Sequence, residues 1–262
     1  MAVMAKLNDV CPSFPLDKLL ARKTPLELCT TGAIGAGKST LVNIVLNGLT
    51  QFEELANITK WLPEGMESLI ESGIFADYIT DINKKIEEQK NLAYIVQHGV
   101  MIAKKNMRKS LIKEFPDAKL VITERSVYDD RYIFTETLHK RGCIAPKIWD
   151  LYETWFADTL TEISFLPSAF VFIDLPIDIC IKRMTERDRK GEDSYDKDYL
   201  QSLTDTYRDT FGHKEFMKIP CYQFPSEFVV RGKSVKYPNF KSDKELQHII
   251  IEFILGIITD LL

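Results

Sequence analysis

The sequence predicts an α/β fold in which a five-stranded parallel sheet carries helices on both faces. Short apolar runs that resemble strands alternate with longer helical segments, an order typical of repeated β-α-β units. The run at residues 170–174 is almost entirely apolar, as expected of a strand covered on both faces. A glycine-rich loop at residues 32–40 joins the first such run to a helical segment. Together these observations indicate a parallel sheet at the centre of the chain.

The composition is that of an ordinary soluble globular protein. Of the 262 residues, 45% are hydrophobic and 27% are charged, which is ample for one large core. The formal net charge of −4 does not favour non-specific binding to nucleic acid or to an anionic membrane. We expect a lead-in over residues 1–25, where three prolines prevent a long helix, and a single domain over residues 26–262.

The cysteines and the first residues bear on the compartment. Five cysteines are scattered without the paired spacing of a metal site, and their odd number favours reduced cytosolic thiols. Residues 1–23 have no signal-peptide pattern and include Asp9 and Asp17, which argues against a transit peptide. We therefore expect a cytoplasmic protein, with the mitochondrion left open.

The first half of the chain is expected to hold two strands and several helices. Residues 26–31 form a short buried strand, and the segment after the glycine-rich loop continues as a helix to about residue 56. Residues 58–62 form a second strand. Residues 67–113 lack proline and are helical in character, and Gly73 is expected to divide them into a shorter and a longer helix.

The second half continues the same alternation. Further strands are predicted at 119–123, 170–174 and 221–224, and helices at 127–139, 147–163, 177–188 and 197–211. Residues 225–242 are expected to form an irregular loop or a hairpin. Residues 248–262 contain two acidic residues and are too short to cross a membrane, so we expect a helix packed on the core or on a partner subunit.

Polar residues follow four of the predicted strands. They are residues 32–38, Glu64, Glu124 with Arg125, and Asp174. In parallel sheets ligands bind beyond the carboxyl ends of the strands, so these residues are expected to meet at one edge.

The loop after the first strand fits the phosphate-binding pattern of two glycines, Gly32 and Gly37, with four residues between them, followed by Lys and Ser. Glycines allow a tight turn in which backbone N–H groups point at a phosphate, and the helix that follows adds its positive N-terminal end. Lys38 is expected to reach the β- and γ-phosphates of ATP, and the Ser39 hydroxyl to hold Mg²⁺. The expected ATP-binding residues of this loop are Gly32, Ala33, Ile34, Gly35, Ala36, Gly37, Lys38, Ser39 and Thr40.

Two further segments carry charges suited to phosphoryl transfer. Glu124 stands at a strand end beside the phosphate loop and can hold Mg²⁺ or its water, while Arg125 can neutralise a transferring phosphoryl group. Arg183 and Arg187 share one helix face and Arg189 follows, an arrangement suited to a lid that closes over a triphosphate.

These three segments resemble the deoxynucleoside kinases, in particular the branch that contains deoxycytidine, deoxyguanosine and deoxyadenosine kinases. Residues 32–40 are similar to the family's phosphate loop, and residues 124–128 with 130–134 are nearly its signature. The three lid arginines also match in order and separation, and the resemblance runs from about residue 26 to residue 211. It implies a P-loop NTPase-type three-layer fold with an arginine lid, and transfer of the γ-phosphoryl of ATP to a nucleoside 5′-hydroxyl, as in nucleotide salvage.

The resemblance also implies the general base. In the family a Glu after the second strand takes the proton of the hydroxyl, and Glu64 is the candidate here, although Gly65 replaces the Pro of the family pattern. Glu53 and Glu54 are rivals, but they lie inside the expected helical stretch.

The remaining substrate contacts are carried over from the same family. Gln97, on the long helix, is expected to read the base, and Asp130 to pair with Lys104, which stands where this branch has Arg. Tyr78 and Glu192 are the candidates for contacts to the sugar 3′-hydroxyl. A carboxylate can accept from the amino group of cytosine or adenine, which thymine lacks, so deoxycytidine or a purine deoxynucleoside is expected over thymidine.

The resemblance suggests a homodimer built on helices of the 127–163 region, with no nucleic-acid or membrane partner. Two alternatives stay open. A nucleoside monophosphate kinase of the thymidylate kinase type shares the fold, but a Glu near the second strand would repel a phosphate-bearing acceptor. A nucleotide-binding module without turnover is the other alternative, against which the complete lid argues.

Overall fold

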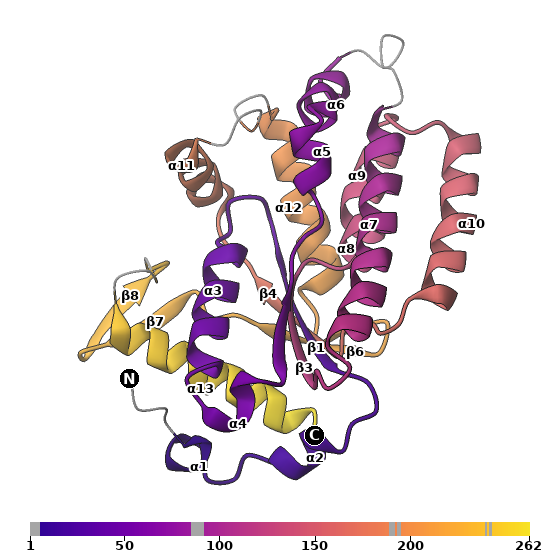
Figure 1. Ribbon diagram of the computed structural model, residues 1–262. Helices are drawn as coiled ribbons and strands as arrows, with labels where there is room; N and C mark the ends of the chain where they lie inside the picture. Colours follow the sequence, from indigo (N-terminus) through magenta and orange to yellow (C-terminus); the bar gives the residue numbers. More distant parts are fainter. Residues whose placement is uncertain (1–5, 85–91, 189–191, 193–194, 239, 241–242) are drawn as a thin grey trace.

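The computed structural model describes residues 6–84, 92–188, 192, 195–238, 240 and 243–262, and has a mostly parallel sheet at its centre (Figure 1). The strand order is β2-β3-β1-β4-β6-β5. The strands are β1 (Leu26–Gly32), β2 (Thr59–Leu62), β3 (Leu120–Glu124), β4 (Ala169–Ile173), β5 (Glu215–Phe216) and β6 (Ile219–Gln223). The five predicted strands pair in parallel, and β5 adds a two-residue antiparallel strand that the sequence does not predict.

Helices surround the sheet. The first seven are α1 (Leu7–Val10), α2 (Leu16–Leu20), α3 (Lys38–Leu49), α4 (Glu53–Ala56), α5 (Glu67–Glu71), α6 (Ile74–Ile82) and α7 (Leu92–Glu114). They are followed by α8 (Val127–Asp129), the π-helix η2 (Asp130–Thr135), α9 (Glu136–Lys140), α10 (Pro146–Glu162), α11 (Ile177–Arg187), α12 (Lys197–Phe211) and α13 (Lys244–Asp260). In the described residues, no helix combines the length and the apolar character needed to cross a membrane.

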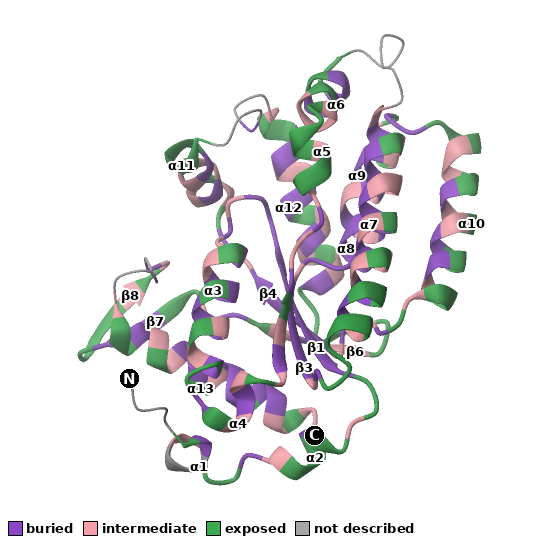
Figure 2. Ribbon diagram, viewed as in Figure 1, coloured by how far each residue is buried: buried purple, intermediate pink, exposed green. Residues whose placement is uncertain are grey.

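The core lies where the helices meet the sheet, and β1 and β4 are buried along their whole length (Figure 2). Side chains of a strand alternate between its faces. On one face of β1, Glu27 pairs with Arg108 of α7 at 2.5 Å, and Thr31 donates a hydrogen bond to Asp129 of α8. Helix α3 packs on β1 and β3, and α13 packs on α3. The C-terminal helix therefore packs on the core, which is one of the two positions expected for it; the other was a partner subunit.

Three expected helices are more divided than the sequence suggests. The helix expected to reach residue 56 ends at Leu49, after Gly48 and before a turn that buries Phe52, so α4 is separate. Residues 127–139 are split by the π-helix, in which the Thr135 hydroxyl bonds the Asp130 carbonyl at 2.6 Å. Residues 67–113 break at Gly73, as predicted, and again after Ile82. Of these breaks, the sequence predicts only the one at Gly73.

Residues 225–242 include a hairpin formed by β7 (Glu227–Val230) and β8 (Lys233–Lys236). Phe228 and Phe240 are buried against Phe224, so the hairpin is anchored to the end of the sheet. This anchoring brings the hairpin beside α3 and α13 (Figure 1).

Candidate active site

The phosphate loop joins β1 to α3 through glycines that no other residue could replace without strain. Gly32, Gly35 and Gly37 have φ angles of +146°, +81° and +99°. A Cβ on Gly32 would lie 2.6 Å from the Ile173 carbonyl oxygen, and one on Gly35 would lie 2.3 Å from the Cys180 carbonyl oxygen. The loop is thus held closely against β4 and α11, with Lys38 as the first residue of α3.

Lys38 is buried beneath this loop. Its Nζ donates to the Ala33 carbonyl at 2.9 Å and lies 3.9 Å from a carboxylate oxygen of Glu124 at the end of β3. Burial, and then the charge of Arg125, lowers the pKa of Lys38 to about 8. The ammonium is therefore poorly compensated, and a bound phosphate would supply the missing negative charge.

Arg125 and Glu64 form an ion pair at the same edge of the sheet. The Arg125 guanidinium contacts the Glu64 carboxylate and also lies over the Phe134 ring, 4.8 Å from its centroid. Burial alone would raise the pKa of Glu64. The positive charge of Arg125, and to a smaller extent those of Lys104 and Lys38, instead lowers that pKa to about 2. Arg125 itself has a left-handed backbone, with φ of 58°.

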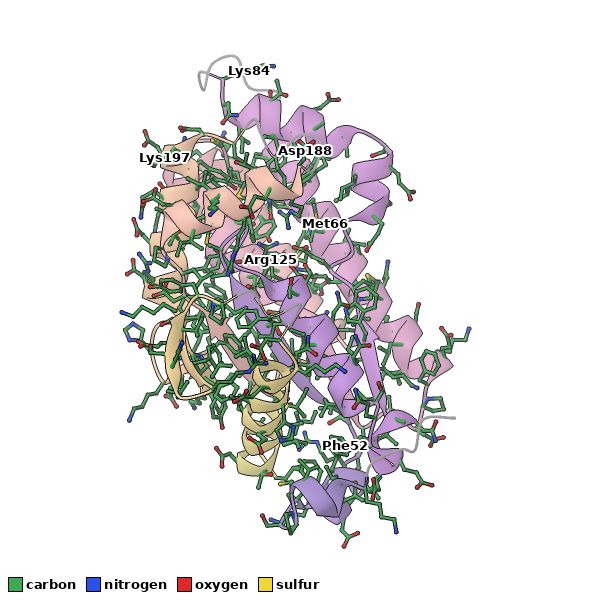
Figure 3. The ribbon with its side chains drawn as sticks, turned by 90° about the vertical axis from the view of Figure 1, so that its left-hand side faces the viewer. Phe52, Met66, Lys84, Arg125, Asp188 and Lys197 are labelled. Carbon is green, nitrogen blue, oxygen red and sulfur yellow. The ribbon has the colours of Figure 1, made fainter. Side chains whose placement is uncertain are left out.

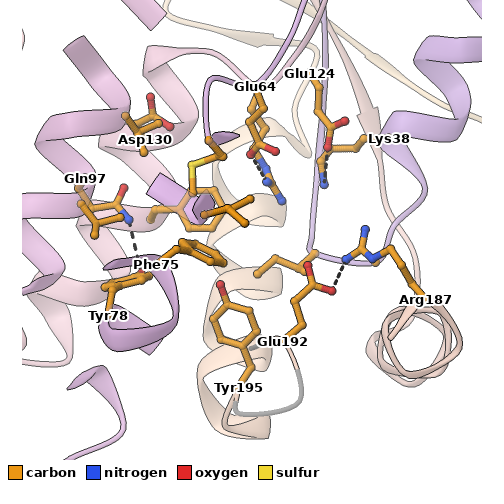
Figure 4. Close-up of a pocket in the computed structure, with 18 residues that line it drawn as sticks. Lys38, Glu64, Phe75, Tyr78, Gln97, Glu124, Asp130, Arg187, Glu192 and Tyr195 are labelled. Atoms are coloured by element: carbon orange, nitrogen blue, oxygen red, sulfur yellow. Dashed lines mark hydrogen bonds and ion pairs between the residues drawn. The ribbon is translucent and has the colours of Figure 1, made fainter. Parts of the chain in front are cut away.

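A narrow pocket extends from this ion pair toward α6 and α7 (Figure 4). It has about 690 Å³ of empty space, part of it continuous with solvent. Gln97 of α7 donates to the Tyr78 hydroxyl at 3.4 Å, and this hydroxyl lies 3.3 Å from that of Tyr199. The apolar walls are formed by Ile34, Met66, Ile70, Phe75, Val96, Val100 and Phe134. Such a pocket suits a flat, largely apolar molecule with a few polar edges.

Asp130 lines the pocket, whereas Lys104 lies behind it. Lys104 is 1% exposed, and its Nζ contacts Asp130 Oδ1 at 2.7 Å and the Ser126 carbonyl at 3.2 Å. Asp130 Oδ2 is buried and has no hydrogen-bond partner among the described residues. Burial raises the pKa of Asp130 to about 6 despite the attraction of Lys104. Asp130 thus lines the pocket, and one oxygen of its carboxylate is buried and unsatisfied.

The lid residues lie on the opposite side of the pocket. Arg187 bonds Glu192 at 2.6 Å, and both residues line the pocket with Tyr195, which the sequence does not single out (Figure 4). Arg183 is set deeper: it donates to the Ala36 carbonyl at 3.1 Å and to the Tyr237 carbonyl at 3.3 Å. Arg189, the third predicted lid arginine, lies outside the described residues.

A second, wider groove lies on the other side of the phosphate loop, and its empty space, which includes open solvent, is about 2420 Å³. Ser39 and Thr40 line it together with cations of α11, and so do Lys236 and Tyr237 of the C-terminal hairpin. Nothing in the sequence marks these hairpin residues, because their only signal is their position in the fold. The groove and the narrow pocket share Gly35, Lys38, Glu124 and Arg187.

The two rival carboxylates and Asp174 lie outside both cavities. Glu53 and Glu54 belong to α4, where Glu54 accepts from the Leu7 backbone N–H at 3.3 Å. Phe52, the residue before α4, lies in the lower part of the molecule, well away from Arg125 near its middle (Figure 3). Asp174 pairs with Arg208 at 2.9 Å. Only Glu64, of the three candidate bases, reaches the edge of the sheet where Lys38 and Arg125 meet.

The donor set around the phosphate loop fits a magnesium ion only in combination with a nucleotide. Within the described residues, no group of three His, Cys, Asp or Glu side chains is close enough to hold a metal on its own. Ser39 and Glu124 both line the groove at the loop and would supply two oxygen ligands, and phosphate oxygens would supply the others.

Comparison with known proteins gives a consistent result. A family model described as deoxynucleoside kinase matches residues 28–252. A Fowlpox virus protein named as a probable deoxycytidine kinase is 29% identical over 71% of this chain and 71% of its own length. Deoxycytidine kinase 2 of Gallus gallus is 24% identical over 99% of this chain and 100% of its own, and mitochondrial deoxyguanosine kinase of Xenopus laevis is 26% identical over 69% and 71%.

Proposed function

The chain belongs to the deoxynucleoside kinase family and is a phosphotransferase, and we propose that it transfers the γ-phosphoryl of ATP to the 5′-hydroxyl of a deoxynucleoside. One observation carries the proposal: a narrow, partly apolar pocket and a wide, cation-lined groove meet at Lys38 and Glu124. The pocket suits a nucleoside and the groove suits a triphosphate, so the reacting groups would meet at the phosphate loop.

The reaction assigns a task to each charged group at this junction. The 5′-oxygen attacks the γ-phosphorus, its proton passes to Glu64, and the bond to the β–γ bridging oxygen breaks. Lys38 and Arg125 balance the charge on the phosphoryl oxygens, while Ser39 and Glu124 would hold Mg²⁺, which supplies further charge neutralisation. Glu64 is a weak base while Arg125 is bound to it. When Arg125 binds the phosphoryl group instead, the pKa of Glu64 would rise, and Glu64 would become a stronger base.

Base selection is assigned to Asp130 and Gln97. The carboxylate of Asp130, which lines the pocket and keeps one unsatisfied oxygen, can accept a hydrogen bond from the exocyclic amino group of cytosine or adenine. Thymine presents a carbonyl and a methyl group there, which leaves the carboxylate without a donor. A site built around a hydrogen bond rejects a ligand that lacks it, so deoxycytidine or a purine deoxynucleoside is favoured over thymidine.

The competing proposal, a nucleoside monophosphate kinase, is less well supported by the charges of the pocket. A phosphate-bearing acceptor needs free cations near the junction. Here Arg125 is paired with Glu64 and Arg187 with Glu192, while Asp130 adds a further carboxylate to the pocket wall. These carboxylates would repel a second phosphate.

The decisive experiment is a phosphate-transfer assay with ATP and Mg²⁺ over the four deoxynucleosides and their monophosphates. We expect turnover with deoxynucleosides, and the highest kcat/KM for deoxycytidine or a purine. Combining Lys104→Met with Asp130→Ala should shift the preference toward thymidine. Turnover of monophosphates alone would favour the competing kinase, and no ATP consumption with any acceptor would favour a binding module. A wild type that prefers thymidine would mean that these two residues do not select the base.

A homodimer is also proposed. Helices α7 and α10 lie side by side and expose Ile95, Ile102 and Leu151, a surface suited to a second copy of the chain. Analytical ultracentrifugation of the wild type and of Leu151→Glu tests this: the wild type should sediment as a dimer and the variant as a monomer.

A further inference from the structure

Arg125 is held by groups from two different elements besides its own. Its Nη1 contacts the Glu64 carboxylate, and its Nε donates to the hydroxyl of Tyr207 on α12 at 3.1 Å. Nη2 is left without a hydrogen-bond partner among the described residues. The guanidinium plane is thus fixed on two sides, and one nitrogen is available to a ligand.

The Tyr207 hydroxyl also bonds Asp129 and so links Arg125 to this carboxylate. A tyrosine hydroxyl can accept a hydrogen bond from Arg125 and at the same time donate its single proton to one other acceptor. The acceptor is Asp129 Oδ1, 3.4 Å away. Tyr207 is 1% exposed and its ring packs on Phe134, the same ring that lies under the Arg125 guanidinium. Arg125, Tyr207 and Asp129 therefore form a continuous buried chain.

Asp129 does more than cap a helix. Its Oδ2 accepts from the Ser126 backbone N–H at 2.8 Å and from the Ser126 hydroxyl at 3.0 Å, which completes the cap of α8. Its other oxygen, Oδ1, accepts from Thr31 and from Tyr207. Thr31 is the residue before Gly32, so this one carboxylate joins the phosphate-loop strand, the turn that carries Arg125, and α12.

The cost of this arrangement also argues for a function. Asp129 is fully buried, and within the described residues it forms no salt bridge. An Asn could complete a simple helix cap without placing a carboxyl group in the core. A carboxylate accepts from every donor around it, which a side-chain amide cannot do, because half of the amide is itself a donor.

We propose that Asp129 and Tyr207 are positioning residues that fix the Arg125 guanidinium relative to the phosphate loop. The inference rests on the proposed function, in which Arg125 meets the transferring phosphoryl group. Glu64 binds Nη1 and Tyr207 binds Nε, so two contacts fix the orientation of the guanidinium plane and with it the direction in which Nη2 points. Loss of the Tyr207 contact would let the plane rotate about its bond to Glu64, which displaces the charge where the transition state needs it.

The test is Tyr207→Phe, which removes the hydroxyl and keeps the ring. We expect kcat to fall by about 10- to 100-fold, the size typical of a displaced catalytic group, while KM for ATP and for the nucleoside changes less than about twofold. Tyr128→Phe is the matched control: Tyr128 is also buried, it lines neither the pocket nor the groove, its hydroxyl bonds neither Arg125 nor Asp129 in the described structure, and its loss should leave kcat unchanged. An unchanged kcat in Tyr207→Phe, or a change confined to KM, overturns the proposal.

A double-mutant cycle separates positioning of Arg125 from a general structural effect. Lysine lacks the Nε donor, so in an Arg125→Lys background the further change Tyr207→Phe should alter kcat less than about twofold. Equal fold-changes in both backgrounds would show that Tyr207 does not act through Arg125, and would overturn the proposal.

A second readout does not depend on turnover. The Arg125 Nε–H gives a nitrogen-correlated NMR signal that is assigned by its absence in Arg125→Lys. We expect its exchange with water to be at least about tenfold faster in Tyr207→Phe, because the buried hydrogen bond that protects it is gone. Unchanged exchange overturns the inference. A wild type that phosphorylates no deoxynucleoside would instead refute the proposed function, and the exchange measurement would still decide the positioning.

Discussion

Because Lys104 and Asp130 form a buried ion pair, we predict that replacing one of them will lower the stability of the fold more than replacing both. Their charged atoms lie 2.7 Å apart, and the side chains are 1% and 4% exposed. Lys104→Met keeps the length of the side chain but leaves the carboxylate buried without its cation. Removal of one partner from a buried pair costs about 3–5 kcal/mol, whereas replacement of both by apolar residues is often neutral.

The expected shift in melting temperature follows from the length of the chain. The entropy of unfolding is about 2.1 cal/mol/K per residue, or roughly 0.55 kcal/mol/K for 262 residues. A loss of about 3–5 kcal/mol should therefore lower Tm by about 5–9 °C at pH 8. Lys104→Met combined with Asp130→Leu should melt within about 2 °C of the wild type, because no charge is then left unpaired.

The penalty should depend on pH with a definite sign. The pKa of Asp130 is raised from 3.8 to about 6 in the folded protein, so its carboxyl favours folding below pH 3.8, and that contribution is lost as pH rises through 6. Lys104→Met removes an attraction that lowers this pKa, so the folded variant keeps its proton to higher pH. The variant should therefore lose less stability, relative to wild type, at pH 6 than at pH 8.

Thermal unfolding of the wild type, the single variant and the double variant, followed by circular dichroism at pH 6 and pH 8, measures both effects. A single variant as stable as the wild type at pH 8, or a penalty of equal size at both pH values, would refute the reasoning. A double variant less stable than the single variant would show that the pair contributes net stability.

Three further predictions concern the reaction. Lys38→Ala should lower kcat by about 10²–10⁴-fold with the fold intact, and near-normal turnover of this variant would disprove the phosphate-loop assignment. In the wild type, kcat/KM for ATP should fall as pH rises above about 8, the pKa at which Lys38 loses its proton. Glu64→Gln should lower kcat by about 10²–10⁴-fold with little change in nucleoside affinity, whereas Glu54→Gln should match the wild type; the reverse result would mean that the general base is misassigned. Lys236→Ala should raise KM for ATP about two- to fivefold, as expected for an exposed charge, while Lys233→Ala, on the same hairpin but outside the groove, should not; equal effects would exclude a donor contact.

Much of the fold could be predicted because its signals are local. The apolar run of β4, the glycines before Lys38 and the Pro that precedes α11 each act within a few residues of their own position. The same holds for Glu64, which was placed at the sheet edge only because a strand ends just before it. The parallel sheet then gathers residues that are far apart in the sequence.

The remainder depends on contacts between distant segments. The π-helix of Asp130–Thr135 contains a side-chain hydrogen bond from Thr135 to the Asp130 carbonyl, and hydrophobic periodicity cannot distinguish it from an ordinary helix. Tyr207 looks like any other core aromatic of an amphipathic helix, and Lys236 like any exposed charge of a hairpin. Their positions beside Arg125 and the phosphate groove follow from how α12 and the hairpin pack, which one sequence does not report.

The packing of α13 on α3 has a consequence for biosynthesis. Gly48 allows the two helices to meet so closely that a Cβ there would lie 2.1 Å from Cδ1 of Ile251. These two residues are 203 positions apart (251 − 48), and a ribosome adds about 5–20 residues per second, so about 10–40 s separate their synthesis. Throughout that interval the nascent chain carries the apolar surface of α3 that α13 will cover, and it is then a natural client for a chaperone that binds exposed hydrophobic segments.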